Sequence, residues 1–126
     1  MAREEVSEFF FRDEIECHGL DCCNHSYPIS STLLKALDVF RAKVNEPVFL
    51  SCAFRCLKHN KSIGSTDTSQ HPRGYAADVE RLPTFTIDAM SAVAESIPEF
   101  SNGGIGLYKS FIHLDVRDLP ARWDSR

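Results

Sequence analysis

Two short stretches of the chain carry histidine and aspartate at spacings that suit a metal site. One spans residues 69–78 and contains His71 and Asp78, and the other spans residues 111–117 and contains His113. A helix would separate His71 from Asp78 by about 10 Å along its axis, whereas the ligand atoms of one zinc ion lie within about 4 Å of each other. A proline and a glycine between the two residues break such a helix. We therefore expect the chain to turn back, so that Asp78 rises on a following strand to face His71.

The second stretch reads as a strand with one polar face. Successive side chains of a strand point to opposite faces, so His113 and Asp115 share one face while Leu114 and Val116 point to the core. We therefore expect one face of this strand to pack in the core and the other to line a cleft.

His71, Asp78 and His113 together offer three protein ligands and leave a fourth position open. This is the pattern of catalytic rather than structural zinc, and zinc lowers the pKa of bound water towards 7, which supplies a nucleophile at neutral pH. The spacing alone leaves a plainer interpretation open, in which His71 is a loop histidine and His113 a core histidine with its hydrogen bonds satisfied.

The elements that must position these residues segregate loosely into helices and strands. Apolar residues recur at helical spacing between residues 31 and 44, where the sequence predicts an amphipathic helix. We expect a second helix over residues 87–97, ended by Pro98, and a short helical turn over residues 56–61. Strands are predicted at 48–54, 75–80, 105–108 and 111–117, the last two as a hairpin, with loops at 17–28 and 62–74. The fold class is α+β.

Composition bounds the class of protein. The 126 residues are 43% hydrophobic and 25% charged with a net charge of −4, which predicts one domain over residues 1–126. The absence of a basic stripe argues against a nucleic-acid partner. No run approaches the roughly 20 apolar residues of a membrane span. The first 13 residues do not resemble a secretory signal, so we expect synthesis in the cytoplasm.

The chain has five cysteines, an odd number that leaves one thiol over in any closed disulfide framework. Reduced thiols are the expectation without an export signal, and small buried cysteines are the plainest role. Two other roles stay open. One is a disulfide between the 17–23 loop and Cys52 or Cys56, and the other is a structural zinc site with Cys and His ligands.

Three ordered motifs resemble the zinc D-Ala-D-Ala carboxypeptidase family, which includes murein endopeptidases and phage endolysins and shares its fold with the hedgehog signalling domain. Residues 69–78 match a Ser-x-His-x-x-Gly-x-Ala-x-Asp motif, and residues 51–60 resemble the family segment Ser-Gly-Tyr-Arg-Cys-Pro-x-His-Asn. Residues 103–117 resemble the family's final strands, in the small branch with a His-x-Asp ending. The resemblance covers roughly residues 8–123 and implies a small, mainly antiparallel sheet flanked by helices.

The resemblance also implies roles for particular residues. His71, Asp78 and His113 would hold one catalytic zinc ion, and Arg55 would bind and polarise a substrate carbonyl or carboxylate. Ser69 would bind substrate or orient the loop, although turn chemistry explains its hydroxyl nearly as well.

The general base of the family is not matched. Many relatives place Glu three residues before the last histidine ligand, where this chain has Ser110, and others place His two residues before it, where this chain has Phe111. By strand geometry the best candidate base is Asp115. The alternative for Asp115 is a carboxylate that supports His113 or pairs with Arg117.

The function that the resemblance implies is a monomeric zinc metallopeptidase that hydrolyses a peptide bond in bacterial peptidoglycan with zinc-activated water. Its partner would be a peptidoglycan stem peptide, and its place of action the cell wall or periplasm, or a phage lysis or virion assembly. The alternative is a non-catalytic zinc-binding module of the same fold. The scissile bond, endopeptidase against carboxypeptidase action, and a phage or bacterial origin stay open.

Overall fold

The computed structural model describes residues 3–66 and 68–126. Residues 1–2 and Asp67, which falls in the predicted loop 62–74, lie outside the described residues. The helices are α1 (Arg12–Ile15), α2 (Ser31–Val44), α3 (Leu57–Ser62), the 3₁₀ turn η1 (His71–Arg73), α4 (Ile87–Glu95) and α5 (Pro98–Ser101). The strands are β1 (Leu50–Cys52), β2 (Ala76–Glu80), β3 (Gly104–Leu107), β4 (Phe111–Asp115) and β5 (Ala121–Asp124).

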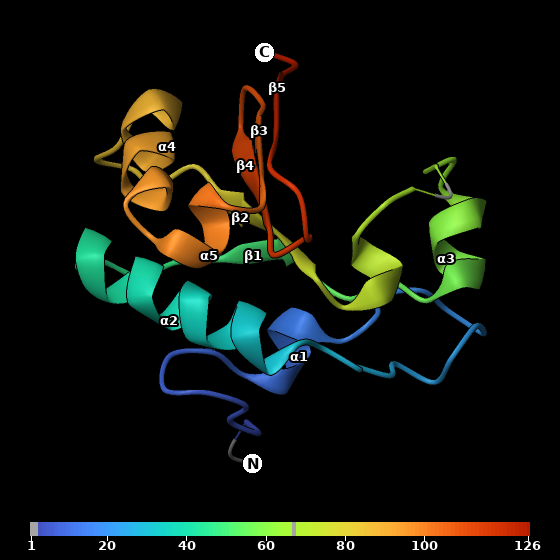
Figure 1. Ribbon diagram of the computed structural model, residues 1–126. Helices are drawn as coiled ribbons and strands as arrows, with labels where there is room; N and C mark the ends of the chain where they lie inside the picture. Colours follow the sequence, from blue (N-terminus) through green and yellow to red (C-terminus); the bar gives the residue numbers. More distant parts are fainter. Residues whose placement is uncertain (1–2, 67) are drawn as a thin grey trace.

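The strands form one five-stranded sheet in the order β1-β2-β4-β3-β5. All pairs are antiparallel except β3 and β5, which run parallel. Helices α4 and α5 pack on β3 and β4, and α2 packs against both helices. In Figure 1, α3 and η1 lie on the other side of the sheet from α4. The predicted fold class, α+β with a mainly antiparallel sheet and flanking helices, is confirmed.

The helix predicted over residues 31–44 forms with those bounds. The Ser30 side chain accepts a hydrogen bond from the Leu33 backbone N–H and caps its first turn. Asn45, in the left-handed conformation at φ 54°, ends the helix. The apolar stripe supplies Leu37 and Phe40 to the core, where both are fully buried. This layer supports the sheet from behind, on the side away from the polar face of β4.

Several element boundaries differ from the sequence prediction. The strand predicted over 48–54 pairs only over Leu50–Cys52, and a register irregularity lies within this short ladder between Leu50 and Cys52. Pro98 begins α5 instead of ending a helix, which suits proline because the first helical N–H needs no partner within the helix. The short elements α1 and β5 were not predicted, since neither carries a clear apolar period. None of the described helices combines the length and apolar character needed to cross a membrane.

Candidate metal centre

The pairing of β2 with β4 places Asp78 directly opposite His113. Residues directly opposite in an antiparallel ladder point to the same face of the sheet, and here that face opens away from α4 and α5. His113 Nδ1 lies 3.1 Å from Asp78 Oδ1. Both side chains are largely withdrawn from solvent, with 10% and 14% of their surface exposed.

His71 reaches the same carboxylate from η1. Gly74 ends this turn in the left-handed conformation at φ 73°, and a side chain there would also collide with the Pro28 carbonyl. The turn sends the chain back into β2, as the sequence predicts for residues between His71 and Asp78. His71 Nε2 lies 3.3 Å from Asp78 Oδ1.

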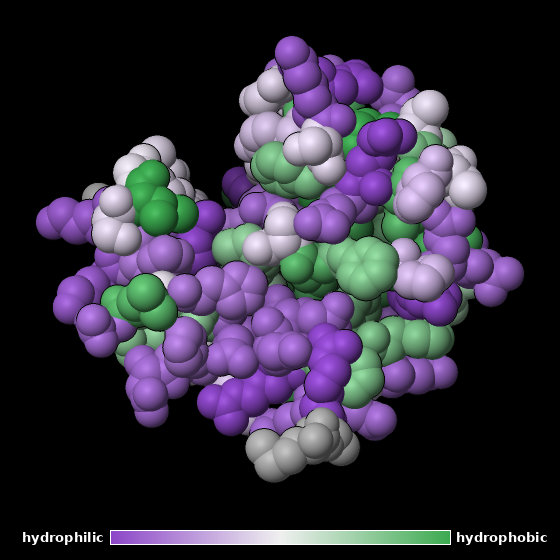
Figure 2. Space-filling view, turned by 180° about the vertical axis from the view of Figure 1, so that it is seen from behind, coloured by the Kyte–Doolittle hydropathy of each residue, from purple (hydrophilic) through white to green (hydrophobic). Residues whose placement is uncertain are grey.

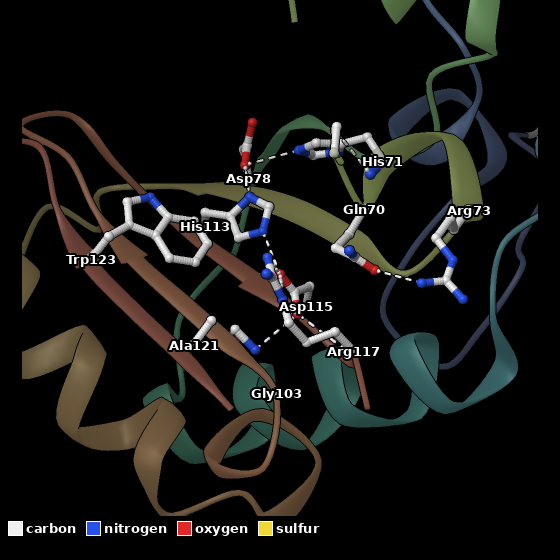
Figure 3. Close-up of polar contacts among 12 residues, drawn as sticks. Gln70, His71, Arg73, Asp78, Gly103, His113, Asp115, Arg117, Ala121 and Trp123 are labelled. Atoms are coloured by element: carbon white, nitrogen blue, oxygen red, sulfur yellow. Dashed lines mark hydrogen bonds and ion pairs between the residues drawn. The ribbon is translucent and has the colours of Figure 1, made fainter. Parts of the chain in front are cut away.

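In each imidazole, the nitrogen that points away from Asp78 donates its proton to an acceptor. The other nitrogen, which faces Asp78, is therefore the one that would offer its lone pair to a metal ion. His71 Nδ1 donates to the Ala53 carbonyl at 2.6 Å, and His113 Nε2 donates to Asp115 Oδ2 at 2.7 Å. Figure 3 shows both rings turned towards Asp78, and the two rings stand nearly perpendicular to each other. Held histidine rings of this kind are typical of metal ligands.

The spacing of these atoms suits zinc. Two ligand atoms bonded to a tetrahedral zinc ion at about 2.0–2.1 Å lie about 3.3 Å apart. The two nitrogen–oxygen separations at Asp78 are 3.1 and 3.3 Å. Two imidazoles and one carboxylate are also the kind of donor set that a catalytic zinc ion takes, with a fourth position left for another ligand.

The charge state of the site follows from its mutual contacts. Burial disfavours the charged form of His71, but Asp78 and the nearby Cys52 outweigh it and raise the pKa of His71 to about 9. The pKa of His113 is raised in the same way, because contacts with Asp115 and Asp78 outweigh burial. Burial opposes ionisation of Asp78, yet the two histidines hold its pKa below the usual range. A bound cation would compete with these protons for the same lone pairs.

Asp115 lies behind His113 and is fully buried. Its Oδ1 accepts the Gly104 backbone N–H at 2.8 Å, and its Oδ2 accepts His113 Nε2 and a guanidinium nitrogen of Arg117, each at 2.7 Å. Burial is outweighed by His113 and Arg117, which hold the pKa of Asp115 below its usual range. A carboxylate with both oxygens occupied and a low pKa is a poor proton acceptor at neutral pH. The geometry favours the supporting role over that of general base.

A cleft of about 440 Å³ opens over the three candidate ligands. One wall comes from the segments on either side of α3, with Arg55 before it and Ser69 after it, and the other comes from the sheet side, with Tyr108 and Trp123. Figure 2 shows the hollow between the lobe that carries α3 and the body that carries the sheet. An Arg55 guanidinium nitrogen lies 3.3 Å from Ser69 Oγ. Arg55 Nε is buried and has no hydrogen-bond partner among the described residues.

Three residues near the metal centre were not assigned to it from the sequence. Gly106 pairs with both His113 and Trp123, and a side chain at Gly106 would collide with the indole. The indole consequently lies beside His113, with ring centroids 5.0 Å apart. A side chain at Gly104 would collide with the Asp115 carboxylate in the same way. The repeated glycines of residues 103–106 were the available signal, because glycine within a strand often marks a close approach.

Cys52 adds a thiol at the edge of the centre. Its Sγ lies 3.8 Å from His71 Nδ1, the nitrogen that faces Ala53, and Cys52, His71 and Asp78 offer ligand atoms within 4.8 Å of one another. The thiol is therefore a further candidate ligand beside His71 and Asp78.

The comparison with protein families agrees with this geometry. The model of the family described as peptidase M15 matches residues 5–115, which include all three candidate ligands. The chain belongs to the peptidase M15 family. A comparison with curated proteins gave no match.

Proposed function

We propose that the protein is a zinc metallopeptidase that hydrolyses a peptide bond in bacterial peptidoglycan. The observation that carries the proposal is the convergence of His71 Nε2 and His113 Nδ1 on one oxygen of Asp78, at 3.3 and 3.1 Å. Membership of the peptidase M15 family supports the reaction class.

His71, Asp78 and His113 would hold the ion. Zinc bound there would act as a Lewis acid on a carbonyl oxygen and lower the pKa of a water molecule to about 7. The Ala53 carbonyl and Asp115 each accept the histidine N–H that points away from Asp78, and so turn the other nitrogen, which a metal ion would bind in place of a proton, towards the site. Asp78 keeps its negative charge at neutral pH, which offsets the charge of a divalent ion.

Arg55 is the group best suited to meet the substrate. Its guanidinium lines the cleft beside the candidate ligands and is tethered by Ser69. A fixed guanidinium stabilises an oxyanion that develops on a carbonyl, and it pairs equally well with a terminal carboxylate. Trp123 and Tyr108 offer apolar surface on the opposite wall, joined by a 2.9 Å hydrogen bond from the indole N–H to the phenol oxygen. We propose that a stem peptide lies between these two walls.

Asp115 acts in this proposal through His113 and does not touch the substrate. Its carboxylate is absent from the residues that line the cleft. The wall of a bacterial cell, reached from outside or by phage-assisted release, is the proposed place of action.

The test is incubation of the purified, zinc-loaded protein with isolated muropeptides, followed by mass spectrometry of the products. We expect cleavage of one stem or cross-link peptide bond, with a loss of at least 100-fold in the variant His113→Ala. The matched control is His18→Ala, because His18 is exposed and lies outside the cleft. Zinc-loaded protein that cleaves no muropeptide bond would contradict the proposal.

A second candidate function is a binding module that holds zinc and a wall peptide without turnover. The specific observation in its favour is that Asp78 is the only carboxylate among the described residues that line the cleft. Binding of muropeptides without cleavage, abolished together with zinc binding in His113→Ala, would identify this alternative.

A further inference from the structure

A second group of metal-binding side chains lies apart from the cleft. Cys17, Cys22, Cys23 and Cys56 bring their sulfur atoms within 4.8 Å of one another. Three of them come from the loop at residues 17–28, and Cys56 stands immediately before α3. Figure 1 shows this loop running alongside α3 at the edge of the molecule away from α4.

The distances within the cluster are those of a metal site. The Sγ atoms of Cys17 and Cys22 are 3.8 Å apart, and those of Cys22 and Cys23 are also 3.8 Å apart. Sulfur atoms on a tetrahedral zinc ion, each bonded at about 2.3 Å, lie about 3.8 Å apart along the edges of the tetrahedron. A disulfide would require about 2.05 Å, and all five cysteines are free.

Backbone contacts fix the sulfur of Cys56 and the position of Cys17 within the cluster. The His59 backbone N–H donates to Cys56 Sγ at 3.3 Å, and hydrogen bonds from backbone N–H groups stabilise charge on sulfur. Cys17 is fully buried, and its own backbone is fixed by a 2.9 Å bond from its N–H to the Ser26 carbonyl. The loop is pressed against α3 so closely that a side chain at Gly19 would collide with Cys22 Sγ and the His59 ring.

Apart from the sulfur atoms, the loop is held by hydrogen bonds such as those from His25 Nδ1 to the Cys17 carbonyl at 2.8 Å and from Lys58 to the Asp21 carbonyl at 3.1 Å. It contains no helix or strand, and Leu20 is 82% exposed. Asp21, Asn24 and His25 adopt the left-handed conformation at φ 56°, 56° and 54°, which costs roughly 1 kcal/mol for each residue. A cross-link through four sulfur atoms would offset these costs, as structural zinc does in small domains.

We propose that Cys17, Cys22, Cys23 and Cys56 bind a structural zinc ion that ties the loop at residues 17–28 to α3. Four protein ligands leave no open position, so this ion takes no part in hydrolysis. Its effect on the cleft is indirect, because α3 leads into the segment that carries Ser69 and forms one wall. The fifth cysteine, Cys52, is the one that lies beside His71.

The test measures the zinc content of protein purified under reducing conditions. The variant His113→Ala, which disrupts the site in the cleft, is the reference. Elemental analysis should find about two zinc ions per chain in the natural protein and about one in His113→Ala. Cobalt substituted into His113→Ala should show the strong near-ultraviolet charge-transfer absorption of a tetrathiolate site. Cys56→Ser should lose this absorption, and Cys52→Ser, the matched control, should keep it.

A second measurement does not depend on any variant folding. Four of the five thiols in the natural protein should resist a thiol reagent until a strong chelator is added, and zinc should be released as they react. The proposal would be overturned by His113→Ala protein that is folded but free of metal, by disulfides among the four cysteines, or by thiols that react before any chelator is present. The proposal stands whether or not muropeptides are cleaved, because none of these readouts uses activity.

Discussion

The rings of His71 and His113 stand nearly at right angles, with centroids 5.2 Å apart, and offer different nitrogens to the same oxygen of Asp78. His71 presents Nε2 because its Nδ1 donates to Ala53, and His113 presents Nδ1 because its Nε2 donates to Asp115. A backbone carbonyl therefore decides which nitrogen His71 presents, and a carboxylate decides which nitrogen His113 presents. Four of the predictions below follow from this arrangement and its surroundings.

Asp115→Asn tests the supporting role of the buried carboxylate. The amide cannot accept the proton of His113 Nε2 as strongly, so zinc affinity should fall about 10- to 100-fold. A competitive chelator titration would measure this loss, and activity should return at saturating zinc. If Asp115 were instead the general base, zinc affinity would be unchanged and activity would stay low at any zinc concentration, with the acidic limb of the pH profile lost.

Arg55→Ala tests the role of the guanidinium in the cleft. Loss of a fixed cationic donor should lower kcat/KM for muropeptides about 100- to 1,000-fold while the zinc content stays unchanged. Arg73→Ala is the matched control, because Figure 3 shows Arg73 directed away from Asp78 and it bonds only to Gln70 among the residues drawn. An equal fall in kcat/KM in both variants would contradict a specific role for Arg55.

Gly106→Ala tests the close packing of the indole beside His113. The added methyl group would collide with the Trp123 ring, so the free energy of unfolding should fall by about 1–3 kcal/mol. The chain has one tryptophan, and its fluorescence emission should shift as the ring is displaced. Gly64→Ala serves as the reference, since nothing lies within 4 Å there and only its φ of 77° is costly. An emission spectrum unchanged in Gly106→Ala would show that the indole does not pack as described.

The stability of the metal-free protein should depend on the protonation of His71. Its pKa in the folded protein is about 9, above the ordinary value of 6.5, because of Asp78 and Cys52. The protonated ring therefore contributes its full stabilisation below about pH 6.5, and this contribution is lost as the pH rises through 9. We expect the free energy of unfolding of chelator-treated protein to fall over this range by on the order of 1–3 kcal/mol.

Urea unfolding at a series of pH values would measure this decline, with zinc-saturated protein as the comparison. Zinc displaces the proton, so its affinity should rise with pH over the same range. Metal-free protein whose stability is flat or rises between pH 6.5 and 9 would contradict the protonation assigned to His71.

Much of the centre could be predicted from the sequence because it depends on local chain geometry. The break between His71 and Asp78 and the alternation through His113 and Asp115 are readable from residue types, and the structure brings all four together. The amphipathic helix over residues 31–44 was equally readable, since its apolar period and caps coincide. Each of these features depends only on residues that are close together in the sequence.

Features that depend on contacts between distant segments could not be predicted. The burial of Asp115 against the Gly104 backbone follows from the β3–β4 register, which no residue type reveals. The same holds for Trp123, which reaches His113 through β5, a strand too short and polar to recognise. The cysteine cluster joins Cys56 to a loop more than 30 residues earlier in the chain, so its members were visible but their convergence was not.

The most direct test of the central claim is a crystal structure of zinc-loaded protein with anomalous diffraction recorded at the zinc absorption edge. The account predicts an anomalous peak within about 2.0–2.2 Å of His71 Nε2, His113 Nδ1 and an oxygen of Asp78. A fully zinc-loaded crystal without a peak at that position, or with the ion bound to His113 Nε2 instead, would contradict it.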